Sequence, residues 1–346
     1  MKTEHKIIFG DSRGMKELKN ESVDLMITSP PYPMIQMWDE IFGKQNQEIT
    51  KALKEEDGEK AFELMNKELD KVWKEVYRVL KVGGIACINI GDATRSIKGK
   101  FQIYTNHARI LNFCLSLGFH ALPEILWVKE TNKPDKFMGS GMLPVGAYVT
   151  LEHEHILILR KDDKREFNKP EQKDNRQKSA FFWEERNMWF SDKWRDINGV
   201  FQKLNHSKLR ERSGAYPIEL TYRLINMFSV QGDVVLDPFL GTGTTTLGAM
   251  ASGRNSIGYE IDNNFKEFIE DRINEIKNIV EEYVKDRLEK HKTFVKKREE
   301  EKGKLKYLSK NYKFPIMTRQ EINIHIPKIE EVKKINENLF EVEHLF

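Results

Sequence analysis

The sequence predicts an α/β protein built on a mostly parallel, doubly wound β-sheet with helices on both faces. Two observations indicate this fold. Short apolar runs alternate with segments whose apolar residues recur at helical spacing, a pattern typical of strands joined by helical crossovers. Two of these runs end in loops of glycine, proline and small polar residues, and doubly wound sheets bind ligands at such loops. The 346 residues suffice for one large domain with insertions or for two domains.

The N-terminal part of the chain contains five predicted strands, each a short and mainly apolar run. They cover residues 7–9, 23–27, 85–90, 123–128 and 155–159. Helices are expected between them. Met15 and Leu18 lie at helical spacing after the first strand, and residues 69–80 and 107–117 form amphipathic patterns, each followed by glycine.

The second strand runs into the loop Thr28-Ser29-Pro30-Pro31-Tyr32. Two prolines in series stop the strand and give a stiff, extended turn whose carbonyl groups remain free acceptors. With the Ser29 hydroxyl before them and the Tyr32 ring after them, the loop can hold a flat ring that bears an amino group. The same residues also fit an ordinary strand end with two turn prolines.

The strand–helix alternation is interrupted by three charged or polar regions. Residues 161–212 carry clustered aromatic and basic residues and are interpreted as an insertion, with residues 129–148 on the same surface. Residues 44–70 are charged, and no function is assigned to them. In the C-terminal extension, apolar and polar residues alternate at positions 322–326, and this alternation predicts one edge strand. The predicted organisation is a sheet domain in two parts, an insertion and a charged extension: residues 1–160 and 213–285, 161–212, and 286–346.

Regular structure resumes at Pro217, since proline is favoured at the first residue of a helix. Strands are predicted at residues 233–237 and 256–260. The first runs through a turn that contains Gly241 and Gly243 into a helix, and residues 265–284 predict a long helix after the second.

The glycine turn predicts a ligand site. Glycines at 241 and 243 allow backbone N–H groups to approach a ligand closely, and Glu260 at the end of the next strand can accept hydrogen bonds from ribose hydroxyls. No Gly-Lys-Ser/Thr sequence follows, and acidic Asp237 favours a cationic or amino group over pyrophosphate. An ordinary strand–helix turn remains the alternative.

Composition restricts the class of protein. Charged residues make up 32% of the chain but nearly cancel to +3, which permits a nucleic-acid partner without requiring one. Cys87 and Cys114 form no CxxC motif, as expected of a protein in the reducing cytoplasm without a disulfide framework or a thiolate nucleophile. The sequence shows no signal region or membrane span. His153 and His155 share a strand face, and we interpret them as solvent-facing positions, not metal ligands.

Together, residues 28–32 and Asp237-Pro-Phe-Leu-Gly-Thr-Gly-Thr-Thr245 resemble the S-adenosylmethionine-dependent DNA amino-methyltransferases, in the order of their β group. The resemblance covers roughly residues 5–275. Further matching segments are Gly10-Asp11, Lys81-Val-Gly-Gly84, Trp127-Val-Lys129, Glu154-His155-Ile156, Trp194 with Ile197, and Ala215-Tyr216-Pro217-Ile-Glu-Leu220.

The resemblance implies a circularly permuted, Rossmann-like class I methyltransferase fold with an inserted target-recognition region. The strands at 233 and 256 would be the first two of the sheet, and those ending near Asp11 and Ser29 the third and fourth. The two loops would then line one crevice where the strand order reverses.

The resemblance also implies S-adenosyl-L-methionine as cofactor. Asp11 would accept from the adenine amino group, Glu260 would hold the ribose and Asp237 the methionine end. The other positions implied to bind the cofactor are Thr28, Pro238, Phe239, Gly241, Gly243 and Thr244. Phe239 equally fits a core aromatic at a strand end.

The implied catalytic residues are Ser29, Pro30, Pro31 and Tyr32. The Ser29 oxygen and the Pro30 carbonyl would accept the N–H groups of a flipped base, so that its nitrogen attacks the sulfonium methyl, while Tyr32 stacks on the ring. Serine at the first motif position resembles N4-cytosine enzymes, whereas aspartate there goes with N6-adenine enzymes. N4 of cytosine is therefore expected, with N6 of adenine as the alternative.

The expected partners are double-stranded DNA and, from the family alone, a companion restriction endonuclease. Residues 161–212 would meet phosphates and read base edges, although Trp183 and Trp189 also fit a small local core. An enzyme that methylates RNA bases or protein amides, or a non-catalytic nucleic-acid-binding module, remains possible on sequence. The oligomeric state is left open.

Overall fold

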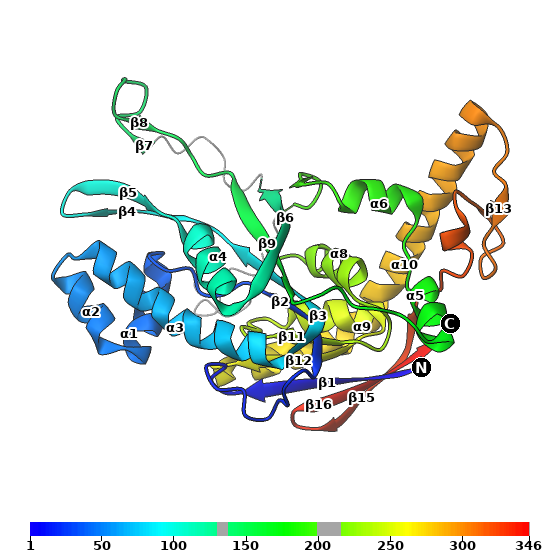
Figure 1. Cartoon of the computed structure of the whole chain (residues 1–346), viewed down its shortest axis with the longest axis horizontal. Helices are drawn as coiled ribbons and strands as arrows, with labels where there is room; N and C mark the ends of the chain where they lie inside the picture. The colour runs from blue at the N-terminus through cyan, green and yellow to red at the C-terminus, as the bar shows by residue number, and fades with distance from the viewer. Residues whose placement is uncertain (130–137, 199–215, 346) are drawn as a thin grey trace.

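The computed structural model of the chain describes residues 1–129, 138–198 and 216–345. Within these residues the central element is a ten-stranded sheet that crosses the whole molecule (Figure 1). Its strands, in spatial order, are β10 (Lys193–Trp194), β6 (Phe119–Val128), β9 (His153–Lys161), β3 (Leu80–Ile90), β2 (Val23–Thr28), β11 (Val234–Asp237), β12 (Asn255–Glu260), β1 (Lys2–Phe9), β16 (Leu339–Leu345) and β15 (Lys328–Asn336).

The middle of the sheet is parallel, as the sequence predicts. Strand β2 lies between β3 and β11 and is parallel to both, with Leu25 opposite Val235 and Met26 opposite Leu236. Strand β11 in turn pairs with β12, and β12 with β1. The predicted permuted order is therefore confirmed: the strand before the proline loop and the strand before the glycine turn are direct neighbours. Antiparallel strands complete both sides, β9 against β3 and β16 against β1.

Helices cover both faces of the sheet because neighbouring strand residues alternate between them. Met26 packs in the cluster that includes α3 (Gly58–Val79) and α4 (Asn106–Leu117). Its neighbours Leu25 and Ile27 pack in the opposite cluster, with α8 (Ile218–Phe228) and α9 (Thr244–Ser252). This two-sided burial explains why β2 has no exposed residue.

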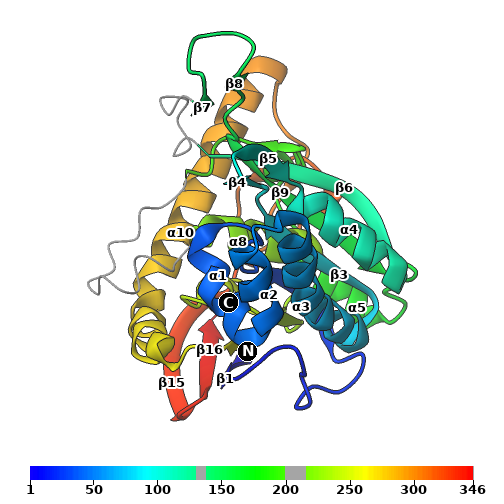
Figure 2. The same ribbon diagram turned by 90° about the vertical axis from the view of Figure 1, so that its left-hand side faces the viewer.

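The charged segment 44–70, which received no function from sequence, is helical. It contributes to α1 (Asp39–Gln45), α2 (Gln47–Lys54) and the first half of α3, at one end of the molecule (Figure 2). Asp57 caps α3 by accepting a hydrogen bond from Lys60 N, so the helix begins well before the predicted residue 69. Buried Met65 shows that this segment carries its own apolar face.

The opposite end of the molecule is built by the C-terminal extension. Helix α10 (Lys266–Lys302) continues far beyond the predicted 265–284 and packs on α6 (Trp183–Trp189). A buried ion pair joins Arg287 to Glu185, and Phe182 stacks on His291 with ring centroids 3.9 Å apart. The chain then returns through β15 and β16, which extend the main sheet beside β1.

Several sequence predictions were wrong. The expected edge strand at 322–326 is absent: Ile324 and Ile326 are buried in irregular backbone, and the main-sheet strands of the extension form only after residue 327. Residues 11–22 form turns instead of the expected helix. The sequence also fitted Trp183 and Trp189 to a small local core. Trp189 is buried, which confirms that core, whereas Trp183 is 39% exposed and stacks on Phe294 of α10.

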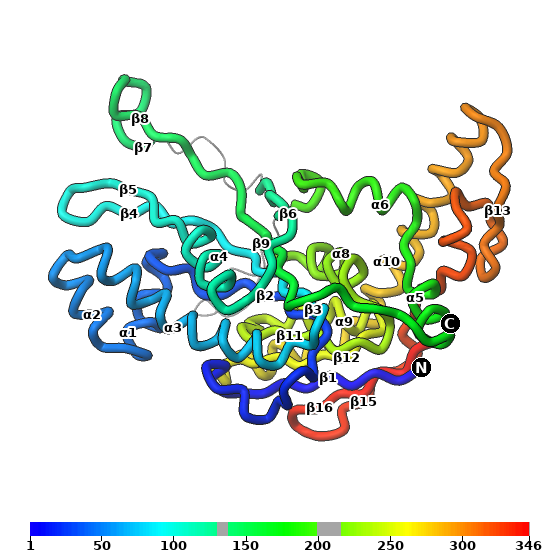
Figure 3. Tube along the Cα trace, in the orientation of Figure 1, coloured from blue at the N-terminus to red at the C-terminus, as the bar shows by residue number. Residues whose placement is uncertain are grey.

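The remaining elements are short. The β4–β5 hairpin, which the sequence did not indicate, projects from the body near the small β7–β8 strand pair (Figure 3). These elements are β4 (Ala93–Ile97), β5 (Lys100–Tyr104), β7 (Met138–Gly139), β8 (Ala147–Tyr148), α5 (Pro170–Lys178), β13 (Tyr307–Leu308), β14 (Pro315–Ile316) and the 3-10 turns η1 (Gln36–Trp38), η2 (Asn263–Phe265) and η3 (Arg319–Glu321). Residues 130–137 and 199–212 of the predicted recognition region lie outside the described residues.

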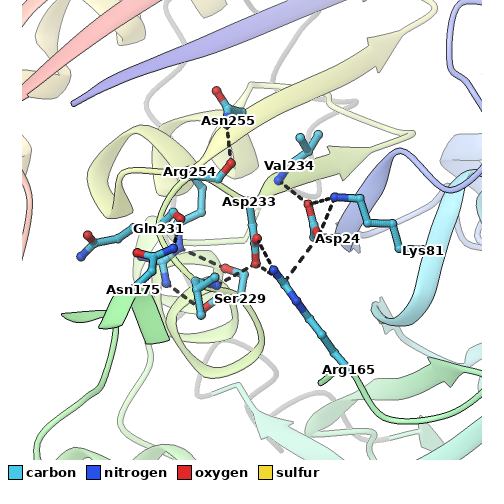
Figure 4. A network of polar contacts seen from close by, with 12 residues as sticks. Asp24, Lys81, Arg165, Asn175, Ser229, Gln231, Asp233, Val234, Arg254 and Asn255 are labelled. Carbon is cyan, nitrogen blue, oxygen red and sulfur yellow. Dashed lines mark hydrogen bonds and ion pairs between the residues drawn. The ribbon is translucent and has the colours of Figure 1, made fainter. Parts of the chain in front are cut away.

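A polar network fastens the start of the insertion to the amino ends of the central strands (Figure 4). The Asp24 carboxylate accepts hydrogen bonds from Lys81 at 2.8 Å and from Val234 N at 3.0 Å. Arg165 forms an ion pair of 2.6 Å with Asp233 and also approaches Asp24. The network lies at the amino edge of the sheet, opposite the loops that follow the carboxyl ends of the central strands. In the described part of the chain, no helix is long and apolar enough to cross a membrane.

Candidate active site

A cavity of about 280 Å³ lies at the carboxyl ends of β1, β2, β11 and β12. The loops after all four strands line it, so the strand order brings together segments that are far apart in sequence. Further walls come from α1 and α3, from Lys129 and Glu154 at the ends of β6 and β9, and from Tyr216 before α8.

The glycine turn forms one wall of the cavity. Gly241 and Gly243 both have positive φ, at 53° and 80°, which L side chains rarely adopt. A Cβ at Gly243 would lie 3.1 Å from Ile269 Cγ2 of α10, so a side chain here would also crowd that residue. Gly243 is also the N-cap of α9, and the turn therefore places the first N–H groups of that helix near the cavity.

Glu260 closes the turn from the neighbouring strand. One carboxylate oxygen accepts from Gly241 N at 2.7 Å and the other from Asp262 N at 2.8 Å. Burial raises the pKa of Glu260 to about 7, because the two backbone donors offset only part of the cost of desolvating a charge. The side chain lines the cavity and keeps lone pairs available for hydroxyl groups of a ligand.

Asp237 joins the two sequence-predicted loops. Its buried carboxylate accepts hydrogen bonds from Thr28 Oγ1 at 2.6 Å, from Thr245 Oγ1 at 2.6 Å and from Phe239 N at 3.0 Å. Tyr216 donates to it at 3.2 Å. Burial raises the pKa of Asp237 against the effect of these donors. The carboxylate is thus engaged on every side within the protein, behind the cavity lining.

Asp11 lies at the mouth of the cavity, after β1. Its carboxylate accepts from Arg13 Nε at 2.8 Å and from Arg13 N at 2.9 Å, and Arg13 also pairs with Glu68 of α3. Partial burial alone would raise the pKa of Asp11, but the bonds and charge of Arg13 outweigh it and lower the pKa. Asp11 is therefore ionised at neutral pH and available as a hydrogen-bond acceptor.

The proline loop forms the facing wall. Tyr32 OH lies 3.0 Å from Ser29 Oγ and donates to Glu154 Oε2 at 3.0 Å. Asn89 of β3 donates to Tyr32 OH at 3.0 Å and to Glu154 at 2.6 Å, and Lys129 forms an ion pair with the other oxygen of Glu154. Burial first, and the charge of Glu154 second, raise the pKa of Tyr32 well above its ordinary value. Tyr32 is therefore a neutral phenol at physiological pH.

Most of the predicted site residues meet at this cavity. Those that line it are Asp11, Ser29, Pro30, Pro31, Tyr32, Pro238, Phe239, Gly241, Thr244 and Glu260. Thr28, Asp237 and Gly243 lie directly behind the lining, and contacts of all the predicted residues with a ligand stay predictions. Phe239 contacts Trp73 edge-on, with centroids 6.0 Å apart, as a core aromatic would, and it also lines the cavity, where cofactor contact stays a prediction.

Sequence reasoning assigned no role to several residues of this site. Asn89, Lys129, Glu154 and Tyr216 surround the proline loop, and the last three lay in segments recognised only as matching the family pattern. The wall formed by η1, α1 and α3 was not connected with the cavity from sequence. Trp38 and Phe42 are single apolar residues before a charged stretch, and the predicted amphipathic helix of residues 69–80, which contains Leu69 and Val72, was not linked to a site.

The interpretation of His155 as solvent-facing was wrong, because its ring stacks on His107 of α4 with centroids 3.8 Å apart. His107 in turn forms a 2.8 Å ion pair with Asp92, and ligand atoms of these three residues lie within 4.8 Å of one another. The two imidazole rings are parallel within 8°, so their lone pairs do not converge on one point. Asp92 also accepts from His107 N, which makes this group a cap of α4.

The donors and surfaces of the cavity suit a ligand with a flat ring, hydroxyl groups and a positive charge. Asp11 and Glu260 supply carboxylates, Phe239 and Leu69 supply apolar surface, and the glycine turn supplies backbone N–H groups. A second flat ring with an amino group would fit beside Ser29 and Tyr32, since both line the same cavity.

Comparisons with known proteins agree with this geometry. Residues 23–271 match a family model described as DNA methylase, of the N6/N4 methyltransferase type. The type II methyltransferase M.MthZI of Methanothermobacter thermautotrophicus is 54% identical over 99% of this chain and 95% of its own length. The type II methyltransferase M.MjaI of Methanocaldococcus jannaschii is 53% identical over 78% of this chain and 91% of its own.

A solved structure from Thermus thermophilus is similar to this chain in both sequence and fold. It is 32% identical, with a TM-score of 0.60, and the similarity covers 78% of this chain and 94% of that one. That protein, provisionally assigned as a DNA modification methylase, was crystallised with S-adenosyl-L-methionine.

Proposed function

The chain belongs to the N6/N4 DNA methylase family of S-adenosylmethionine-dependent methyltransferases, and from this membership we propose that it methylates the exocyclic N4 of a cytosine in double-stranded DNA. The observation that carries the proposal is the 2.6 Å hydrogen bond from Thr28 to Asp237. It fixes the proline loop and the glycine turn on either side of one cavity, as transfer between two bound molecules requires.

The glycine-turn side is proposed to bind S-adenosyl-L-methionine, which supplies a methyl group on a cationic sulfur. Glu260 would accept from the ribose hydroxyls and Asp11 from the adenine amino group, while Phe239 covers the ring. The Thr28–Asp237–Thr245 bonds keep the turn in place, so Asp237 acts mainly by holding the two loops and contributes negative potential from behind the lining.

The proline-loop side is proposed to hold a base flipped out of the duplex. Ser29 Oγ and the Pro30 carbonyl accept the two N–H bonds of the amino group, which localises the nitrogen lone pair, and the Tyr32 ring stacks on the base. The polar contacts of Tyr32 with Ser29, Asn89 and Glu154 fix the ring before the base enters.

Cytosine is proposed because serine stands at position 29, the first residue of the proline motif, where N6-adenine enzymes of the family have aspartate. N6 of adenine is the second candidate. The deciding experiment is modification-sensitive sequencing of DNA from cells that express the protein, with mass spectrometry of the released nucleosides. N4-methylcytosine supports the proposal, N6-methyladenine replaces it with the second candidate, and unmodified DNA refutes both.

RNA-base or protein-amide methylation and a non-catalytic role remain as alternatives. In a competition assay, unlabelled duplex DNA should displace a labelled DNA duplex, and RNA of the same sequence should not. Binding of labelled S-adenosylmethionine separates an enzyme from a binding module. The names of M.MthZI and M.MjaI, both type II methyltransferases, support a restriction–modification context, in which we propose a companion endonuclease.

Target recognition is proposed for residues 161–212 together with 129–148, although the structure makes one part of this region a poor candidate. Helix α5 lies at the amino edge of the sheet, where Asn175 donates to Gln231 O at 2.8 Å, away from the cavity. Residues 183–198 and the projecting β7–β8 pair are the better placed candidates for contact with DNA.

A further inference from the structure

The cavity has an acidic side chain beside the proline loop that takes no chemical part in the proposed transfer. Glu154 lines it at the start of β9, is only 9% exposed and makes its polar contacts on the proline-loop side. Its carboxylate contacts Tyr32 and Asn89 through Oε2 and Lys129 through Oε1. A buried carboxylate is costly, so its place beside the proline loop calls for a chemical reason.

We propose that Glu154 is the final acceptor of the proton that the target amino group loses on methylation, and that Tyr32 and Ser29 relay this proton to it. The inference rests on the proposed function, because it requires an amino group held at Ser29. Glu154 does not touch the base in this scheme, and Ser29 is the contact residue.

The need for an acceptor follows from the balance of the reaction. The amino nitrogen uses its lone pair to form the new N–C bond, the C–S bond breaks, and its electron pair stays on sulfur. Without proton loss the nitrogen would become positively charged, so an acceptor that takes one proton while the N–C bond forms lowers the barrier to the transfer. A serine hydroxyl is a poor base, so a site with serine at position 29 needs another group to take this proton.

The hydrogen bonds provide a continuous path. The nitrogen gives its proton to Ser29 Oγ, Ser29 gives its own to Tyr32 OH over 3.0 Å, and Tyr32 gives its own to Glu154 Oε2 over another 3.0 Å. The products are a neutral methylamino group, a neutral thioether and a protonated Glu154, which releases the proton to solvent. Tyr32 suits this role because its raised pKa keeps it a phenol, able to pass a proton only while it receives one.

The groups that face Glu154 come from four elements. Lys129 after β6 compensates the charge of the resting carboxylate, Asn89 of β3 donates to it, and Tyr32 donates from the proline loop. Tyr216 before α8 interacts electrostatically with Tyr32. His155, the next residue of β9, points to the opposite face, where it stacks on His107.

Other carboxylates of the site are less suitable acceptors. Asp237 already accepts four hydrogen bonds behind the lining. Asp11 is paired with Arg13, and Glu260 accepts from two backbone N–H groups in the opposite wall. Among the carboxylates of the described residues, only that of Glu154 is linked to Ser29 through a shared hydroxyl, the phenol of Tyr32.

The test is the pH dependence of single-turnover methyl transfer, measured with enzyme in excess over a duplex that carries the unmethylated target site. For Glu154→Gln the rate at pH 7 should fall about 100-fold, the scale of general-base contributions. It should then rise with pH and with the concentration of buffer base, which replaces the lost acceptor. The matched control Glu152→Gln changes an exposed glutamate two residues away and should behave as wild type.

Further measurements separate proton transfer from a structural role. Tyr32→Phe keeps the ring but breaks the path, so it should show the same rate loss and pH profile, and the double variant should be no slower than either single variant. Affinities for S-adenosylmethionine and for duplex DNA, measured by calorimetry, should stay within about twofold of wild type.

The outcomes are distinguishable. Wild-type protein that methylates no DNA would refute the proposed function. An active wild type with a Glu154→Gln profile of unchanged shape, or with a rate loss fully explained by weaker binding, would refute the relay alone.

Discussion

Replacing Thr28 with valine tests the link between the two loops of the active site. Valine has the shape of threonine and the same β-branched preference for strands, so the buried end of β2 should keep its packing. The change removes only the Oγ1 donor, which lies 2.6 Å from Asp237 Oδ1. Phe239 N continues to donate to the same oxygen, so the carboxylate is not left without a partner on that side.

The expected cost is about 2 kcal/mol, the usual range for a hydrogen bond to a charged group being about 1.5–3 kcal/mol. A chain of 346 residues unfolds with an entropy of about 0.7 kcal/mol/K, so the melting temperature should fall by about 3 °C. The loss of stability should be largest where Asp237 is ionised. Because burial raises the pKa of Asp237, this loss should shrink as the pH is lowered and the carboxylate becomes protonated.

Urea denaturation at pH 8 and pH 5, together with the affinity for S-adenosylmethionine, provides the assay. Thr293→Val, on the exposed face of α10, is the matched control and should change stability by less than about 0.5 kcal/mol. A Thr28→Val protein as stable as wild type at pH 8, with unchanged cofactor affinity and turnover, would show that this contact does not hold the loops together.

Three further results are expected. Ser29→Ala or Tyr32→Ala should leave S-adenosylmethionine binding within about twofold while lowering methyl transfer by about 100-fold or more, and a variant with full turnover would contradict the assigned roles. Burial lowers the pKa of His5 to about 3 and of His344 to about 4, so as the pH falls below about 6.5 these histidines are protonated first in the unfolded chain. The contribution of the two neutral histidines to stability is therefore fully present above that pH. Below it, the free energy of unfolding should decline by about 1.4 kcal/mol per pH unit for each histidine, down to the folded-state pKa. In acid denaturation, the stability of His5→Asn should decline less steeply with falling pH than that of wild type. Equal slopes of stability against pH for variant and wild type would contradict this prediction. Glu185→Gln leaves a buried arginine of α10 without its carboxylate and should cost about 3–5 kcal/mol in urea titrations, while a loss below about 1 kcal/mol would mean that α6 is held otherwise.

The sequence predicts the centre of this molecule well and its edges poorly. Strands β2 and β11 are buried on both faces, so their sequences are continuous apolar runs that end at unmistakable loops. The strands at the sheet edge beyond β1 expose one face to solvent. In β15 only Ile329 is buried, so the apolar alternation of a strand is hidden by lysine and glutamate, and the regular spacing at 322–326 was mistaken for it.

The same distinction applies to the site. Ser29, Tyr32 and Gly241 could be identified because their motifs are local in sequence and dictated by backbone geometry. Glu154 could not be given a role, because its meeting with Tyr32 depends on β9 running antiparallel to β3 in one particular register. The helices of residues 39–79 could not be connected with the cavity, because an apolar helix face, or a single apolar side chain in a charged stretch, does not reveal what it covers.

The pairing of β2 with β11 joins residues more than two hundred positions apart, so a nascent chain on the ribosome carries its proline loop long before the facing glycine turn exists. Until residue 237 has left the exit tunnel, one edge of β2 stays unpaired and Thr28 has no carboxylate to bind. We therefore expect unfinished translation products to be inactive and to expose one unpaired edge of β2, which favours self-association, until the glycine turn has been synthesised.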